Sequence, residues 1–382
     1  MSFDHPMQGI YTVAPNGRTY ASHEFGNTLF LLPTAFVNHL LSQTLTRAGM
    51  SPERIELAEN FVMSFQAGLY VALILAFLYH ILNRVYGQPS RTAFLACCVL
   101  AFTSFLWTYS RELFDGVLAS LLMIASLWFL LRFRDSGAWT AEAAAFALLG
   151  LAVDTRLSMV VFVVASLYFV LAHGPKPRVQ SLLIAGLALA PFALWQVYYN
   201  HLRTGNPLLS PVQTPQYAFN NALDGNLAEG LLGLILSPGK GLFVYAPVLL
   251  ISVLVFPRFA RKDRAVATYI LIAAALWLLL HARLRSWYGA WGLGPRHMIT
   301  ILPLLAIPAL VHLPKLGNRT WSRWASALLL VPGFLLALAS ITGNYHHRLE
   351  LASLRGYNDS TFIWGLHNQA VDMLESLRHI LL

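Results

Sequence analysis

The sequence contains few charged residues for its length. Asp, Glu, Lys and Arg make up only 11% of its 382 residues, whereas hydrophobic residues make up 57%. A soluble domain carries roughly a quarter charged residues, so this chain has too few charges to cover a water-facing surface. The composition therefore excludes an ordinary soluble protein and favours an integral membrane protein.

Cysteine is almost absent, and no basic run is long or dense enough to bind nucleic acid. The two cysteines, Cys97 and Cys98, are adjacent, so they cannot form an ordinary disulfide with each other and have no metal-type spacing. The formal net charge of +9 is therefore a signal of membrane topology rather than of a nucleic-acid surface. The 10 Trp and 15 Tyr suit a protein that anchors at two membrane interfaces.

Long apolar runs recur along the chain, and a run of about 17–25 apolar residues is enough to cross a bilayer. They predict an all-α, polytopic integral membrane protein with about ten transmembrane helices. The runs lie near 62–83, 92–109, 114–131, 141–153, 158–172, 179–199, 241–256, 266–282, 298–313 and 324–343.

The stretch 140–172 can be read in two ways, because Asp154-Thr155-Arg156 interrupts it. As one long helix it would hold Asp154 and Arg156 near the middle of the membrane, at a cost of about 2.5 kcal/mol or more each. As a hairpin it has two short legs that meet at the polar turn. The charge distribution favours the hairpin, because with a hairpin the short basic loops all lie on the same side of the membrane.

That side is predicted to be cytoplasmic, because positive charge in short loops orients a membrane protein. It holds half of the 26 lysines and arginines, whereas the acidic residues there are only Asp135 and Asp263, with Glu142 near its boundary. The basic residues are Arg84, Arg91, Arg132, Arg134, Lys176, Arg178, Arg258, Arg261, Lys262, Arg264, Lys315, Arg319 and Arg323.

The N-terminal region is then predicted to lie outside the membrane. Residues 1–60 would form part of a first outer loop with an interfacial helix at 25–47, followed by a transmembrane domain at 61–343 with outer loops 200–240 and 283–297, and an outer tail at 344–382. No signal sequence precedes Asp4, so we expect a transmembrane helix upstream of the given start. In the alternative, 25–47 is itself a span.

Four predicted outer segments carry unusual polar content. They lie around residues 20–26, 109–115, 198–245 and 283–297. The candidate catalytic acids are Asp4, Glu24, Glu112 and Asp115, and the candidate substrate-binding residues are His23, Arg111, Arg156, Lys240, Arg285, Trp287, Tyr288, Arg296 and His297.

Each outer segment also has a simpler explanation, since Arg and Lys at helix ends often extend to lipid headgroups and Trp and Tyr often sit at the interface. Taken together, basic residues beside apolar helices suit a lipid phosphate or diphosphate. A nearby carboxylate can act as base on an acceptor hydroxyl while the cations stabilise the leaving phosphate. The aromatic loop with Gly289, Gly292 and Gly294 can stack on a sugar ring.

These segments resemble bacterial members of the GT-C glycosyltransferase superfamily, related to the protein O-mannosyltransferase and aminoarabinose transferase families. The resembling pieces are 20–33, 109–116, 154–156, 199–200 with 204–207, 237–247 and 287–297. The resemblance implies a multispan fold, an outward-facing active site and a polyprenyl-phosphate-linked sugar as donor. It also implies a catalytic Asp or Glu just after a first span, and neither that span nor its acidic motif is present here; Asp4 and Glu24 are the acids available in that loop.

The leading hypothesis is a glycosyltransferase that transfers a sugar to a lipid, glycan or protein acceptor at the outer face of a bacterial inner membrane. The expected partners are membrane lipids, the lipid-linked donor and an unknown acceptor, without nucleic acid. A divalent metal is compatible with such chemistry, but no residue pattern indicates one. The alternatives are a non-catalytic binder or transporter of a lipid-linked sugar and a polysaccharide polymerase.

Overall fold

The computed structural model describes residues 11–15, 17–21, 24–211, 222–289, 293–316 and 320–342. These residues are almost entirely helical, which confirms the all-α fold class. Five helices are long and apolar enough to cross a membrane, and shorter apolar helices accompany them. The described part of the chain is therefore that of a multi-pass membrane protein, while the number of spans stays a prediction.

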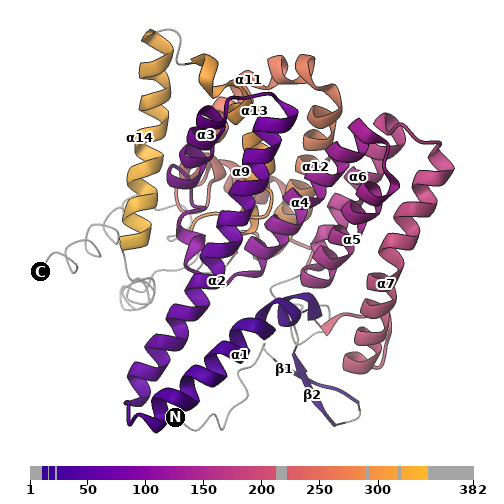
Figure 1. The fold of residues 1–382 in the computed structure, drawn as a ribbon, viewed down its shortest axis with the longest axis vertical. Coiled ribbons are helices and arrows are strands. Elements are labelled where there is room, and N and C mark those ends of the chain that lie inside the picture. Colours follow the sequence, from indigo (N-terminus) through magenta and orange to yellow (C-terminus); the bar gives the residue numbers. More distant parts are fainter. Residues whose placement is uncertain are drawn as a thin grey trace, which may run out of the picture. The chain divides into compact units, whose positions relative to one another are not determined.

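Figure 1 shows the fold as a ribbon. Contacts between residues divide the chain into two compact units. The first unit comprises residues 1–67 and 113–224, and the second comprises 68–112 and 225–382. The long helix α2 (Pro52–His80), which continues as a π-helical turn at Ile81–Val85, contributes to both. Each unit is described by itself below.

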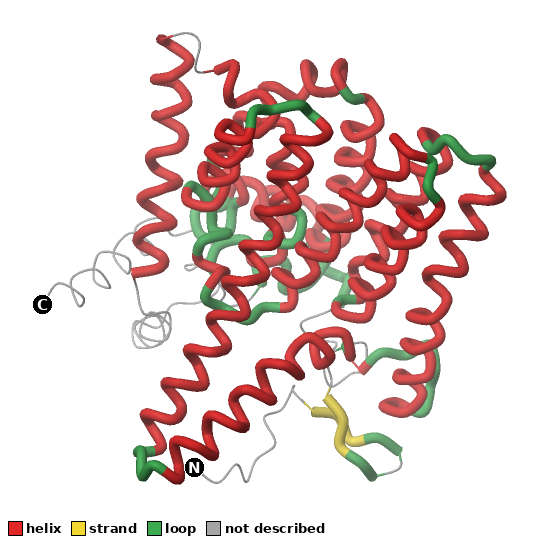
Figure 2. The backbone as a smooth tube through the Cα atoms, in the orientation of Figure 1, coloured by secondary structure: helices red, strands yellow, loops and turns green. Residues whose placement is uncertain are grey.

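The first unit begins with a short antiparallel β-hairpin that the sequence analysis did not predict (Figure 2). Strand β1 (Tyr11–Val13) pairs with β2 (Thr19–Ala21). Gly17 in the connecting turn has φ 76°, a conformation that glycine adopts without steric cost. The Asn16-Gly17 pair is a strong hairpin signal in a sequence, so the signal was present.

Helix α1 (Phe25–Arg47) confirms that 25–47 is helical, although its position at the membrane interface stays a prediction. It runs antiparallel to the first part of α2 (Figure 1), and polar side chains join the two helices. Asn38 Nδ2 donates to Glu59 O at 3.3 Å, and Gln66 Nε2 donates to Phe30 O at 2.6 Å. A polar seam therefore lies between two helices whose other faces expose large apolar side chains such as Phe36 and Phe61.

Helix α4 (Asp115–Ser136) is largely buried and packs against α5 (Trp139–Thr155) and α6 (Val160–His173). Helix α5 ends where Arg156 adopts φ −156°, and a 3-10 turn at Leu157–Met159 leads into α6. The predicted pair of short helices in place of one long helix is therefore confirmed. The last helix of the unit, α7 (Arg178–Thr204), packs against α5.

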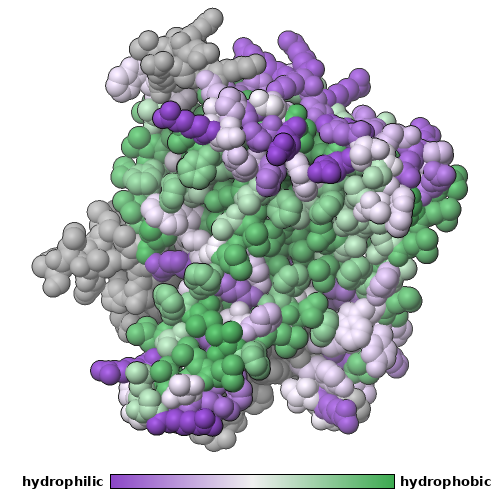
Figure 3. Space-filling model, in the orientation of Figure 1, coloured by the Kyte–Doolittle hydropathy of each residue, from purple (hydrophilic) through white to green (hydrophobic). Residues whose placement is uncertain are grey.

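The opposite side of α7 is apolar and exposed, with Leu187 at 75% exposure. A surface of this kind is stable only against lipid or another protein. Figure 3 shows apolar side chains over much of the visible helical surface, with hydrophilic residues gathered near helix ends.

The second unit contains α3 (Ser90–Phe102), α9 (Leu227–Leu236), α10 (Leu242–Tyr245), α11 (Val248–Lys262), α12 (Arg264–Ala282), α13 (Leu302–Leu316) and α14 (Thr320–Thr342), with 3-10 turns at Thr108–Ser110 and Arg296–Met298. Helices α11 and α13 pack together, and Ser252 Oγ accepts from Ala309 N at 3.2 Å. Helix α9 lies inside the predicted outer loop 200–240 and was not predicted.

Two predicted span boundaries were wrong in this unit. The run 92–109 is helical only to Phe102, because Thr103 Oγ1 and Ser104 Oγ donate back to the carbonyls of Val99 and Leu100, at 2.7 and 2.6 Å, and close the helix. The run 241–256 is divided at Pro247, whose ring and missing N–H interrupt a helix.

Candidate functional site

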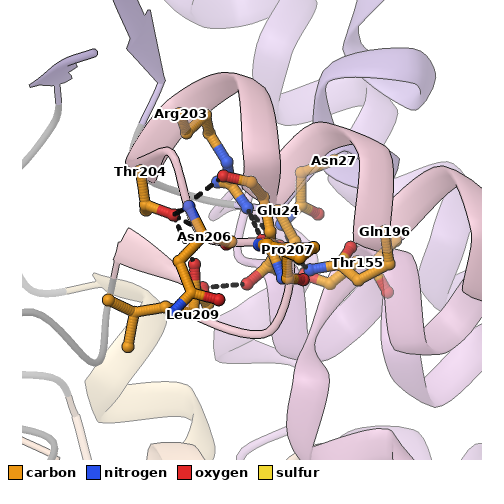
Figure 4. Close-up of polar contacts among 11 residues, drawn as sticks. Glu24, Asn27, Thr155, Gln196, Arg203, Thr204, Asn206, Pro207 and Leu209 are labelled. Atoms are coloured by element: carbon orange, nitrogen blue, oxygen red, sulfur yellow. Dashed lines mark hydrogen bonds and ion pairs between the residues drawn. The ribbon is translucent and has the colours of Figure 1, made fainter. Parts of the chain in front are cut away.

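A buried polar cluster of the first unit surrounds Glu24, the residue before α1 (Figure 4). Glu24 is only 5% exposed. Gln196 Nε2 donates to its Oε2 at 2.7 Å, Arg203 Nη2 donates to the same oxygen at 3.0 Å, and Ser210 Oγ donates to Oε1 at 2.7 Å. Glu24 and Arg203 therefore form a buried ion pair, in which both carboxylate oxygens accept hydrogen bonds.

The partners of Glu24 come from one face of α7 and from the loop after it. Gln196, Asn200 and Arg203 are spaced so that they follow one another along that face. Asn200 Oδ1 accepts from Arg203 Nη2 at 2.8 Å and lies 3.3 Å from Gln196 Nε2. This polar stripe lies in the last part of α7, and its spacing is the signal in the sequence that marks these partners of Glu24.

The loop after α7 brings Ser210 back to the carboxylate. Helix α7 ends at Gly205, whose φ of 75° lets its N–H reach His201 O at 2.9 Å. Thr204 Oγ1 accepts from Asn206 N at 3.1 Å, and Asn206 Oδ1 accepts from Leu208 N at 3.0 Å. These local bonds fix a tight loop, so Ser210 reaches Glu24 across a large distance in sequence.

Aromatic rings cover one side of the ion pair. The Arg203 guanidinium carbon lies 4.0 Å from the centroid of the Tyr199 ring, which is cation–π geometry. Trp195 stacks on Tyr199 with an interplanar angle of 12°, and Phe25 lies 4.8 Å from Trp195 between ring centroids. The rings exclude water and strengthen the attraction between the two charges.

The predicted hairpin turn lies against the start of α1. Asn27 Nδ2 donates to Thr155 O at 3.1 Å, and a Cβ atom added to Gly26 would lie 2.8 Å from Asp154 O. Only glycine allows this approach of two backbones. The turn that carries Asp154 and Arg156 is therefore fastened beside the Glu24 cluster.

In the second unit, the two predicted outer loops meet. Gly225 N donates to Arg283 O at 3.0 Å, and Arg283 Nη1 donates to Gly225 O at 2.9 Å. Trp287 is 3% exposed and its ring covers Gly233 on α9, where a Cβ atom would overlap the indole. Segments 225–236 and 283–289 therefore form one packed surface.

Lys240 is completely buried, at 0% exposure. Its backbone N–H donates to Ser237 Oγ at 2.9 Å in a tight turn, and Gly241 N donates to Ser237 O at 2.7 Å. A lysine that extended independently to lipid headgroups would expose its ammonium group. The burial of Lys240 thus favours a role inside the protein over that of a surface anchor.

The remaining candidate residues of the 283–297 loop differ in exposure. Arg285 is exposed, whereas Arg296 is partly buried and its side chain packs on Gly289, which has φ 72°. Tyr288 is partly buried, with its ring edge-on to Trp287 at 5.8 Å between centroids. His297 is buried.

His297 packs with two residues of α12. Trp277 Nε1 donates to His297 O at 3.0 Å, and the His281 and His297 rings lie 5.2 Å apart between centroids. The loop end at His297 is therefore tied to the helix that precedes the loop.

The candidate acids fall in different places. Glu112 is partly buried in the second unit, where exposed Arg111 bonds to Ile341 O. Asp115 begins α4 in the first unit, and its Oδ1 accepts from Gly116 N at 2.8 Å. Asp4 and His23 lie outside the described residues. Arg156 belongs to the first unit and Lys240 and Arg296 to the second, so a clamp of all three on one phosphate stays a prediction.

Among the described residues, no three His, Cys, Asp or Glu side chains are grouped so as to hold a metal ion. The cluster around Glu24 instead combines a carboxylate, the Arg203 guanidinium, two side-chain amides and the Ser210 hydroxyl. These groups bind one another and form a buried hydrogen-bonded network around the ion pair.

The sequence matches the model of the dolichyl-phosphate-mannose–protein mannosyltransferase family over residues 55–199, which is less than half of the chain. This match confirms the resemblance to GT-C membrane glycosyltransferases. The matched region includes the helical hairpin of α5 and α6 but ends before Arg203, Lys240 and Arg296.

No curated protein matches the chain. Among solved structures, the chain is similar to the crystal structure of ArnT from Cupriavidus metallidurans bound to undecaprenyl phosphate. The sequence identity is 15% and the TM-score is 0.45, with 93% of this chain and 70% of that chain covered.

Proposed function

We propose that this protein is a glycosyltransferase that uses a polyprenyl-phosphate-linked sugar as donor. The observation that carries the proposal is the family match over residues 55–199 in a chain with several apolar helices. Carboxylate, amide, hydroxyl and cationic side chains near helix ends supply the groups that such a reaction needs. The transferred sugar and the acceptor, whether lipid, glycan or protein, are left open.

The proposed chemistry is a single displacement. The acceptor hydroxyl oxygen bonds to the anomeric carbon of the sugar, the bond from that carbon to the phosphate oxygen breaks, and a carboxylate takes the hydroxyl proton. Cationic residues stabilise the charge that develops on the leaving phosphate. Arg156, at the turn between α5 and α6, is the residue to which we assign this last role.

The experiment is transfer by the purified protein in lipid nanodiscs, measured as release of polyprenyl phosphate from a donor with labelled sugar. Arg156→Ala is expected to weaken donor binding about 10- to 100-fold, since a hydrogen bond to a charged group contributes about 1.5–3 kcal/mol. Arg134→Ala, which removes the solvent-accessible pair with Asp135, is the control and is expected to bind donor normally. Release at the rate of protein-free nanodiscs would contradict the proposal.

A second candidate function is binding of a lipid-linked sugar without transfer. The observation in its favour is that the Glu24 carboxylate is already engaged by three donors, so this acid has little capacity left for catalysis. The same experiment separates the two functions. Tight donor binding with no release of polyprenyl phosphate would support binding without transfer.

We further propose that the turn between α5 and α6 faces the outside of a bacterial inner membrane, because the short basic loops would then all be cytoplasmic. A cysteine introduced at Ser158, in a protein with Cys97 and Cys98 replaced, is expected to react with an impermeant thiol reagent in intact spheroplasts. A cysteine at Asp135, in the last turn of α4 just before α5, serves as the opposite-side control. Labelling of Ser158→Cys only after permeabilisation would mean that this turn faces the cytoplasm, contrary to the proposal.

A further inference from the structure

A further buried carboxyl group of the first unit lies at the end of α5 that is remote from the Glu24 cluster. Glu142 stands in the first turn of α5 and is completely buried. About 12 residues, or about 18 Å of helix, separate it from the turn after α5. Helices α5 and α7 pack together (Figure 1), and Ser181 near the start of α7 is also completely buried. Its side chain lies beside the Glu142 carboxyl.

The oxygen atoms of these two side chains are not satisfied by the protein. Neither carboxylate oxygen of Glu142 has a hydrogen-bond partner of normal geometry in the described part of the chain, and the same holds for Ser181 Oγ. Buried polar groups are nearly always hydrogen-bonded, and a buried carboxylate without a partner is costly. Three oxygen atoms from two helices are therefore left for a ligand.

The neighbouring lysine does not neutralise the carboxylate. Lys176, in the loop between α6 and α7, is close enough to act electrostatically on Glu142. It forms no hydrogen bond to either carboxylate oxygen, and its side chain is partly exposed. A lysine ammonium group that reaches water stays hydrated at little cost. Lys176 therefore acts on Glu142 from a distance.

The charge and the donor set indicate which ligand fits. Oxygen atoms are the ligands that hard metal cations prefer. A monovalent cation neutralises one buried carboxylate, whereas a divalent cation would leave one positive charge uncompensated in the same buried place, which is costly. One carboxylate and one hydroxyl therefore suit an alkali cation.

We propose that Glu142 and Ser181 bind an alkali cation, Na⁺ or K⁺, which ties the first turn of α5 to the start of α7. The two carboxylate oxygens and the hydroxyl oxygen are its side-chain ligands, and water or backbone carbonyl groups complete the coordination. The site lies at the opposite end of α5 from Arg156. It is therefore separate from the phosphate-binding role proposed for Arg156.

The test is thermal unfolding of the purified protein in detergent at constant pH and ionic strength. The only added cation is Na⁺, K⁺ or the bulky organic cation N-methylglucamine. Na⁺ or K⁺ is expected to raise the unfolding temperature by about 2 °C or more in a saturable way, because a ligand that binds only the folded state stabilises it. The ion with the larger shift is the preferred one. Equal unfolding temperatures in the three cations would overturn the proposal.

Variants of the two ligands locate the effect. Glu142→Gln is expected to abolish the shift, and Ser181→Ala is expected to reduce it. Asp135→Asn, which removes an exposed carboxylate just before α5, is the control and is expected to keep the full shift. Ser181→Ala carries the test by itself if Glu142→Gln fails to fold. A full shift in Ser181→Ala, or in folded Glu142→Gln, would overturn the proposal.

The variant Lys176→Ala separates the cation from two alternatives. With an alkali cation in the site, loss of the neighbouring positive charge is expected to tighten cation binding at least about twofold. If the Lys176 ammonium were itself the counter-ion of Glu142, Lys176→Ala would lower the unfolding temperature equally in all three cations. If the carboxyl held a proton, stability would depend on pH and not on the cation. Either result would overturn the proposal, and none of these measurements depends on the proposed function.

Discussion

The cluster around Glu24 and the surface formed by residues 225–236 and 283–289 are held together by different forces. The first is a buried ion pair between Glu24 and Arg203, with hydrogen bonds on both carboxylate oxygens. The second is a close packing of glycine, aromatic ring and backbone, in which Trp287 covers Gly233. A charged cluster is sensitive to the loss of one partner, whereas a packed surface is sensitive to added volume.

The largest effect is expected from Arg203→Leu, because this change leaves Glu24 buried without its counter-charge. Breaking a buried ion pair by removal of one partner costs about 3–5 kcal/mol. The measurement is the thermal unfolding of the purified protein in detergent. Arg134→Leu is the control, since Arg134 pairs with exposed Asp135 and exposed pairs contribute about 0–1 kcal/mol.

The double variant Glu24→Leu with Arg203→Leu sharpens this test. Replacement of both charges by apolar side chains is often neutral, so the double variant is expected to be more stable than Arg203→Leu alone. If the double variant lost as much stability as the two single variants together, the two charges would not act as a pair.

An intermediate effect is expected from Gly233→Ala in the packed surface. The added methyl group overlaps the Trp287 indole, and overpacking of this kind costs about 1–3 kcal/mol. A change in tryptophan fluorescence together with a lower unfolding temperature would report the displacement. Gly186→Ala on α7 is the matched control, because a Cβ atom there meets nothing within 4 Å. Equal effects of the two changes would contradict the packing described for Trp287.

The smallest effect is expected from Tyr199→Leu, which removes the ring beside Arg203 but keeps an apolar side chain. Loss of a cation–π contact costs about 0.5–2 kcal/mol, so the change should destabilise the protein less than Arg203→Leu. The same thermal unfolding assay measures it. A loss as large as that of Arg203→Leu would mean that the ring, and not the ion pair, dominates the cluster.

The helices could be predicted from the sequence because apolar runs carry their own signal. Each of the ten predicted runs overlaps a helix, and the polar turn at Asp154 correctly divided 140–172. The ends were harder to predict where a hydroxyl or proline close to an apolar run decides them, as at Thr103, Ser104 and Pro247. The β-hairpin was missed although Asn16-Gly17 signals it.

The site was predictable only in part. Glu24 and Arg156 stood out as charged residues at predicted helix ends, but the partners of Glu24 did not. The contacts from Glu24 to Gln196, Arg203 and Ser210 join segments far apart in the sequence, and no local pattern specifies which distant side chains meet. The complete burial of Lys240 is likewise set by tertiary packing.

The central claim is that the protein recognises the phosphate of a polyprenyl-linked donor, and direct binding tests it. The measurement compares polyprenyl phosphate with the uncharged polyprenol of equal length, each titrated into the protein in nanodiscs of neutral lipid. We expect polyprenyl phosphate to bind at least about tenfold more tightly, because a hydrogen bond between charged groups contributes about 1.5–3 kcal/mol. We expect Arg156→Ala to reduce that preference and Arg134→Ala to keep it. Equal affinity for the two lipids in the unaltered protein would contradict the claim.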